Sequence, residues 1–329
     1  MDHKEQLLQQ PEKESKIEIE IFLISHVGQF DVDGFKNKFK QADIYVPEQL
    51  ILTDPRLLET VLNEVSLGKK SPEEALSEFG VTDEGSFYYF TKAQFDMIFN
   101  SGKKIWIVED ILSRRNEEIF NKMSESSAKY KSALSVEEAV SAIKEYFVAR
   151  GEFERKREEF ISKKIKERTE QLQNSGQETS QTDKIKILLT LGAMHTGAGH
   201  ILEREFNDVK NLFSFDMPIR FGLGIEALRR TRFGLEINDK LAKRALIEEY
   251  LTRYIGNKII KNPKNIGDLN YEKIISFLVK IVDGFDEDEV TDILKQIYDE
   301  NKNYNTVIAS VLDRKGIVIP AEDFVHKGN

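Results

Sequence analysis

The segment from residue 184 to residue 203, KIKILLTLGAMHTGAGHILE, constrains the fold more than any other part of the chain. An apolar run typical of a buried strand leads into a turn that contains Gly192, Gly197 and Gly199, and a helical pattern of apolar residues follows. This order is typical of α/β proteins, which keep their sites at the carboxyl edge of the sheet. The apolar positions are Ile185, Ile187, Leu188, Leu189 and Leu191 in the strand, and Ile201, Leu202, Phe206 and Val209 in the helix.

Two of the five histidines of the chain, His195 and His200, belong to this turn. Glycine lets the backbone bend without a Cβ clash, so we expect these imidazoles to be presented to a ligand. The turn lacks the lysine and Ser/Thr of a P-loop and the third glycine of a dinucleotide fingerprint, and the chain has no G-x-S-x-G elbow. These absences argue against nucleotide binding and against a serine hydrolase.

The remaining pattern predicts an α/β fold with a mostly parallel sheet flanked by helices, a long charged helix and a helical C-terminal region. We expect a disordered arm over residues 1–16, an α/β domain over 17–235 and a helical subdomain over 236–329. Further strands are predicted at 17–25, 43–47 and 103–109, with a short final strand at 316–319, a long charged helix at 136–173 and a polar linker at 174–183.

Composition limits the class of protein. The net charge of −9 leaves no basic surface for non-specific nucleic-acid binding. The absence of cysteine excludes disulfides, thiolate nucleophiles and zinc–thiolate sites. The polar N-terminal residues contain no apolar signal segment, and no run of about 18 apolar residues occurs. We therefore expect a cytoplasmic protein without a transmembrane segment.

Four side chains with metal-binding chemistry lie where a predicted strand ends: His26, Glu48, Glu109 and His195. Because the carboxyl ends of parallel strands share one edge, these four are expected to converge. Two imidazoles and two carboxylates suit a divalent zinc, manganese or cobalt ion, which would lower the pKa of a bound water, and a carboxylate outside the metal shell could act as general base.

Each candidate also has a structural interpretation. A charged residue after a strand often marks only the point at which the chain reaches water. Glu48 is preceded by Pro47, so turn geometry alone could explain its position. Only one of Glu109 and Asp110 is expected to point inward. His200 is either a further ligand or an ordinary residue in the first turn of the next helix.

The G-x-x-H of Gly192 to His195, the strand that ends in His26 and the pattern from Ala42 to Glu48 resemble a superfamily. It includes the TraB/PrgY proteins, the Tiki metalloproteases, the erythromycin esterases and the ChaN haem-binding lipoproteins. The stretch from Arg157 to Ile165 is similar to a helix of the erythromycin esterase branch whose arginine faces the active cleft. The resemblance spans residues 17 to about 215.

This resemblance implies that His26 and His195 correspond to the paired motif histidines, Glu48 and Glu109 to the acidic residues, and Arg157 to the cleft arginine. Arg157 would then hold a substrate carboxylate or stabilise developing negative charge. The chain departs from the pattern at Leu23, which replaces the glycine of the first motif and could crowd a metal.

The sequence therefore predicts a metal-dependent hydrolase that acts on an ester or amide bond of a small molecule or peptide. In this hypothesis His26 and His195 bind the metal, and Glu48 or Glu109 completes the shell while the other acts as base. Two alternatives stay open: a non-catalytic protein that binds a ligand such as haem, and a regulatory protein that acts through its C-terminal helices. Substrate, metal identity and oligomeric state do not follow from the sequence.

Overall fold

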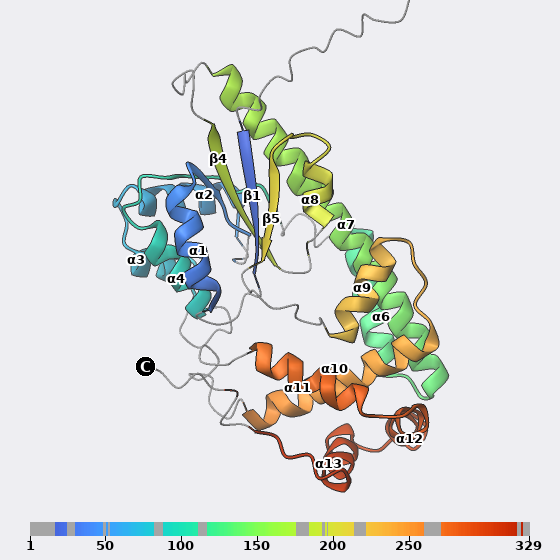
Figure 1. Cartoon of the computed structure of the whole chain (residues 1–329). Coiled ribbons are helices and arrows are strands. Elements are labelled where there is room, and N and C mark those ends of the chain that lie inside the picture. The colour runs from blue at the N-terminus through green and yellow to red at the C-terminus, as the bar shows by residue number, and fades with distance from the viewer. Residues whose placement is uncertain are drawn as a thin grey trace, which may run out of the picture.

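The chain folds around a five-stranded parallel sheet with the strand order β3-β2-β4-β1-β5, and the helical C-terminal region lies beyond its carboxyl edge (Figure 1). This confirms the predicted α/β fold. The predicted arm, most of the predicted linker and His26 lie outside the described residues. The computed structural model describes residues 17–24, 30–48, 51, 53–81, 88–110, 117–175, 184–192, 195, 197–213, 222–259, 271–320 and 324.

Two long strands form the centre of the sheet. β1 (Ile17–Ile24) pairs with β4 (Ile185–Gly192) over its whole length, so that Ile17 lies opposite Ile185 and Ile24 opposite Gly192. β5 (Val209–Phe213) pairs with the other side of β1. β2 (Ile44–Val46) pairs with β4, and β3 (Lys104–Ile105) forms the edge beyond β2.

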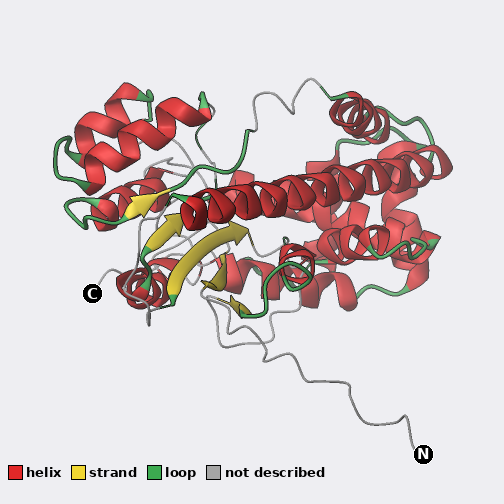
Figure 2. Ribbon diagram, turned by 90° about the horizontal axis from the view of Figure 1, so that it is seen from above, coloured by secondary structure: helices red, strands yellow, loops and turns green. Residues whose placement is uncertain are grey.

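Both faces of the sheet are covered, which is why the central strands β1 and β4 carry apolar residues on both of their faces. Ile19 and Ile21 point toward α7 (Val136–Asn174) and α8 (Gly197–Leu202), whereas Phe22 and Ile24 point toward the opposite layer. That layer consists of α1 (Phe30–Gln41), α2 (Pro55–Ser66), α3 (Pro72–Glu78) and α4 (Tyr88–Ile98), and Figure 2 shows α7 crossing the other face.

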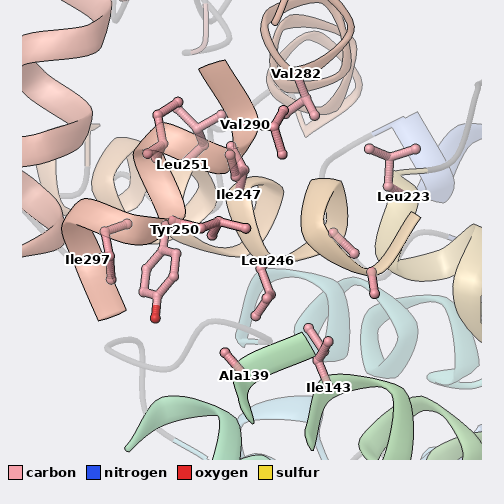
Figure 3. Packing of buried hydrophobic residues seen from close by; sticks show 14 of the residues in the cluster. Ala139, Ile143, Leu223, Leu246, Ile247, Tyr250, Leu251, Val282, Val290 and Ile297 are labelled. Carbon is pink, nitrogen blue, oxygen red and sulfur yellow. The ribbon is translucent and has the colours of Figure 1, made fainter. Parts of the chain in front are cut away.

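The C-terminal helices form a second apolar core with α6 (Glu118–Lys131) and the first half of α7. Figure 3 shows Ala139 and Ile143 of α7 near Leu246 of α10, and Leu223 of α9 belongs to the same core. The helices of this region are α9 (Leu223–Arg232), α10 (Asp239–Ile259), α11 (Tyr271–Asp283), α12 (Glu287–Tyr298) and α13 (Tyr304–Arg314).

Helix α7 connects the two cores. Its N-terminus is capped by the Ser135 side chain, which accepts from the backbone N–H of Glu138. Ala139 and Ile143 are buried in the helical core, and Ile161 and Ile165 are buried against the sheet. The residues between these two sets cross the carboxyl edge of the sheet.

Three details of the predicted strands are wrong. Only Lys104 and Ile105 of the stretch 103–109 pair as a strand, because Pro47 has no N–H with which to extend the ladder after Val46. Val209 begins strand β5 instead of continuing a helix, since α8 already ends at Leu202. Residues 316–319 form no strand, and Ile317 and Ile319 pack on the helical core instead.

No helix among the described residues combines the length and the apolar character that a membrane crossing requires.

Candidate functional site

The candidate site begins where β4 ends at the carboxyl edge of the sheet. Glu48 follows β2, and its Oε2 accepts a hydrogen bond from the backbone N–H of Gly192 at 2.5 Å. The backbone N–H of His195 donates to the carbonyl of Gly192 at 2.8 Å and closes a tight turn. The strand ends therefore place a carboxylate and an imidazole beside each other, and the Nε2 of His195 lies 3.6 Å from Oε1 of Glu48.

Arg157 of α7 lies at the centre of these groups. Its guanidinium grips Glu109 with two donors: Nε contacts Oε1, and Nη2 donates to Oε2 at 2.9 Å. Nη2 also donates to Oε1 of Glu48 at 2.6 Å. The remaining nitrogen, Nη1, lies 2.8 Å from Nε2 of His195. One guanidinium thus connects three of the side chains that the sequence places at strand ends.

The long helix α7 supplies two further acids that the sequence interpretation missed. Oε2 of Glu154 lies 3.5 Å from Nη1 of Arg157 and 3.7 Å from Nε2 of His195. Oε1 of Glu158 lies 3.5 Å from Nδ1 of His195. Residues 154, 157 and 158 share one helix face because they are three or four positions apart. With Arg157 as a candidate, this spacing in the sequence predicts that Glu154 and Glu158 lie beside it.

A second arginine approaches from the helical C-terminal region. Nη2 of Arg232, at the end of α9, pairs with Oε1 of Glu158. Both side chains are almost fully buried, with 7% and 2% of their surfaces exposed. No local pattern links residue 232 to residue 158, so this pair could not be found from the sequence.

The cluster is buried and electrostatically coupled. His195 is 1% exposed and Glu109 is 2% exposed. Burial alone would lower the pKa of Arg157, but Glu48 and Glu109 raise it well above its usual value, so the guanidinium stays charged. Burial and the charge of Arg157 lower the pKa of His195, yet Glu158, Glu48 and Glu154 outweigh them and raise it to about 9.

The contact between His195 and Arg157 fixes one protonation state. An arginine nitrogen only donates, so Nε2 of His195 accepts this hydrogen bond only when it carries no proton. A hydrogen bond from Nη1 to Nε2 therefore belongs to the neutral imidazole with its proton on Nδ1, the form that prevails above the raised pKa of about 9. Protonation of Nε2 would break the contact with Nη1 and turn the ring toward the carboxylates of Glu48 and Glu154.

The other predicted residues behave differently. His200 is exposed on α8 and contacts Glu203 at 3.3 Å, with no contact to the cluster. Leu23 is fully buried within β1 and packs toward α7. His26 lies outside the described residues, although β1, which leads to it, ends with Ile24 opposite Gly192.

The described members of the predicted donor set, Glu48, Glu109 and His195, do not fit a divalent metal as they stand. Both oxygens of Glu109, one oxygen of Glu48 and the Nε2 of His195 already face the guanidinium of Arg157. Within the part of the chain that the structure describes, no three His, Asp or Glu side chains are grouped to hold a metal ion. The positive charge expected from a metal is supplied at this position by Arg157.

A groove of about 770 Å³ adjoins the cluster between α2 and α7. Glu109 and Asp110 are among its lining residues, and Phe160 and Lys164 of α7 form part of one wall. The opposite wall includes Glu59 and Asn63 of α2. Glu109, whose carboxylate contacts Arg157, therefore belongs both to the cluster and to the lining of the groove.

Comparison of the chain with protein-family models, curated proteins and solved structures found no match. The resemblance to the TraB, Tiki and erythromycin esterase superfamily therefore rests on the short motifs alone.

Proposed function

We propose that the cluster around Arg157 and His195 hydrolyses an ester or amide bond of a small molecule or peptide. The single observation that carries this proposal is the 2.8 Å contact between Nη1 of Arg157 and Nε2 of His195. It brings together a basic nitrogen without a proton and a cationic donor. When water attacks a carbonyl group, the first can accept the proton of the water and the second can stabilise the oxyanion.

In the proposed reaction His195 is the general base. Its Nε2 takes a proton from a water molecule while the water oxygen forms a bond to the carbonyl carbon of the substrate. The resulting imidazolium is stabilised by Glu48 and Glu154, which lie 3.6 and 3.7 Å from Nε2. The same carboxylates raise the pKa of His195 and so make it a stronger base.

Arg157 has the complementary role. When Nε2 becomes protonated it no longer accepts from Nη1, and this N–H is released to the oxyanion that forms on the substrate. Glu109 and Glu48 hold the other nitrogens of the guanidinium in place. The imidazolium then returns its proton to the leaving alkoxide or amine as the carbon–heteroatom bond breaks.

The proposal assigns no step to a metal, because the guanidinium occupies the centre of the donor set. The adjoining groove is proposed to hold the part of the substrate that extends from the reacting bond, with Phe160 offering an apolar surface and Lys164 a positive charge. The groove is lined by acidic as well as basic side chains, so this arrangement favours a partly apolar substrate and assigns no preference for its charge.

A panel of alkyl esters, aryl amides and short peptides, followed by mass spectrometry in ¹⁸O water, tests the proposal. We expect incorporation of ¹⁸O into the acid product, with turnover unchanged by a chelator and reduced at least about 100-fold in His195→Gln, the range that general bases contribute. His200→Gln is the matched control. Equal turnover in His195→Gln and the native protein, or no hydrolysis of any ester or amide, would count against the proposal.

A further inference from the structure

We infer that Arg232, acting through Glu158, is a positioning residue that holds His195 in the tautomer with the proton on Nδ1. The inference deepens the proposed function and rests on it, because a general base at Nε2 needs this tautomer. It gives the helical C-terminal region a role in a site that is otherwise built at the edge of the sheet.

Arg232, Glu158 and His195 lie one after another, each within contact distance of the next. Nη2 of Arg232 contacts Oε1 of Glu158, and the same oxygen lies 3.5 Å from Nδ1 of His195. On the other side of the ring, Nε2 faces Nη1 of Arg157 at 2.8 Å. Carboxylates lie at similar distances from both ring nitrogens, since Glu48 and Glu154 are 3.6 and 3.7 Å from Nε2, and it is the cationic donor at 2.8 Å that distinguishes Nε2 from Nδ1. Nδ1 makes no hydrogen bond among the described residues, and Glu158 is the carboxylate that lies 3.5 Å from it, so the negative charge of Glu158 favours a proton on Nδ1.

Gly197 packs so closely against Glu158 and Arg232 that no side chain fits at this position. A Cβ on Gly197 would lie 2.5 Å from Oε2 of Glu158 and 2.6 Å from Nη2 of Arg232. Glycine at this position therefore lets the turn after His195 approach the ion pair directly. This close contact is the physical reason for a glycine at position 197 of the glycine-rich turn.

Helix α9 is held against α7 in a similar way. A Cβ on Gly151 of α7 would collide with Oγ1 of Thr231, the residue next to Arg232. The Thr231 hydroxyl donates to the carbonyl of Phe147 at 3.1 Å and to that of Leu228 at 2.8 Å. The end of α9 is thus fixed to α7 one residue before Arg232.

Burying the charges of Arg232 and Glu158 costs desolvation free energy, which an apolar pair of the same size would avoid. Replacing a buried pair with apolar residues is often neutral or stabilising, so such a pair is weak evidence for a purely structural role. Here one oxygen of the pair faces the ring nitrogen opposite the proposed base. This placement is the reason for assigning the pair to the orientation of His195.

The test is ¹⁵N nuclear magnetic resonance of the full chain labelled at the histidine rings, recorded at pH 10.5, where the ring is neutral. The His195 signals are assigned with His195→Gln. We expect the native ring to carry its proton on Nδ1, and Arg232→Ala to shift the ring toward the Nε2–H tautomer. Arg232→Lys should restore much of the native signal, and Arg230→Ala, which removes an arginine from the same turn of α9, should leave it unchanged.

Glu158→Gln provides a second route if Arg232→Ala fails to fold, because it keeps the size of the side chain and leaves no buried carboxylate at position 158 without its cation. It should also weaken the preference for Nδ1–H. If a substrate is hydrolysed, Arg232→Ala should lower kcat about 10- to 100-fold with little change in KM, the range found for groups that orient an imidazole through a second contact.

The outcomes separate the two proposals. A native Nδ1–H tautomer in folded Arg232→Ala and in Glu158→Gln would overturn the positioning role, whether or not the protein is a hydrolase. A tautomer shift in a chain that hydrolyses none of the panel would support the positioning role and contradict the proposed function.

Discussion

Nε2 of His195 and Nη1 of Arg157 lie 2.8 Å apart and cannot both carry a hydrogen along the line between them. Protonation of the histidine therefore requires a rearrangement, in which the ring leaves the guanidinium and turns toward Glu48 or Glu154. The proposed reaction uses this exchange, and it also has consequences for stability that need no knowledge of the substrate.

The first prediction concerns the pH dependence of stability. The pKa of His195 is raised from 6.5 to about 9 in the folded chain. A raised pKa means that the folded state binds the proton more tightly, so this stabilisation is complete below pH 6.5 and disappears as the pH rises through 9. At about 1.4 kcal/mol per pKa unit it amounts to a few kcal/mol.

Urea denaturation of the native protein and of His195→Gln between pH 6 and pH 10 checks this prediction. The free energy of unfolding of the native protein should fall relative to that of the variant between about pH 6.5 and pH 9, and the difference should level off above pH 9. His200→Gln, which changes an exposed imidazole, should follow the native curve. Parallel curves for native protein and His195→Gln would show that His195 does not take part in the coupling.

The second prediction concerns Arg157 as the counter-charge of the cluster. Arg157→Leu leaves Glu48 and Glu109 buried without their shared cation, which should cost about 3–5 kcal/mol of unfolding free energy at pH 7. Arg155→Leu is a matched control two positions earlier, since it removes only an exposed pair with Glu159 and should cost no more than about 0.5 kcal/mol. Similar losses for the two variants would contradict the central place of Arg157.

The third prediction concerns metal binding. Removal of the guanidinium in Arg157→Ser should free the oxygens of Glu48 and Glu109 and the Nε2 of His195 to bind zinc, manganese or cobalt. Isothermal titration calorimetry should detect one site in this variant and none in the native protein. A single site in the native protein that is lost in His195→Gln would instead support the metal centre expected from the sequence.

The fourth prediction compares two glycines inside helices. Gly151→Ala should destabilise the chain, because the new methyl group collides with Thr231 and separates α9 from α7. Gly256→Ala, in α10, meets no atom within 4 Å and should stabilise the chain by about 0.5–1 kcal/mol through helix propensity. Thermal unfolding of both variants measures the difference. Stabilisation by both substitutions would show that α7 and α9 can separate at no cost.

The parts of the fold that the sequence predicts well are those with a strong local pattern. The continuous apolar runs of β1 and β4 predict buried central strands, and the structure pairs them along their full length. The short elements are harder to predict. The end of β3 depends on Pro47, the residue that follows the neighbouring strand β2. β5 begins at Val209, which belongs to a set of apolar residues whose spacing suits a helix equally well.

Some residues of the candidate site can likewise be predicted from the local sequence, and others cannot. Glu48, Glu109 and His195 can be proposed from the sequence because each follows an apolar run and parallel strands share an edge. The contact of Arg157 with all three follows only from the path of α7 across that edge. Arg232 depends on the packing of α9 on α7, a contact between distant segments that leaves no mark in the local sequence.

The most direct test of the account is the dependence of kcat/KM on pH for an unactivated ester or amide that the native protein hydrolyses. With His195 as the base, kcat/KM should rise with pH and level off above an apparent pKa near 9, and this limb should be absent from the residual activity of His195→Gln. A rate that is independent of pH between 6 and 10, or the same rising limb in His195→Gln, would contradict the assignment of His195 as the base.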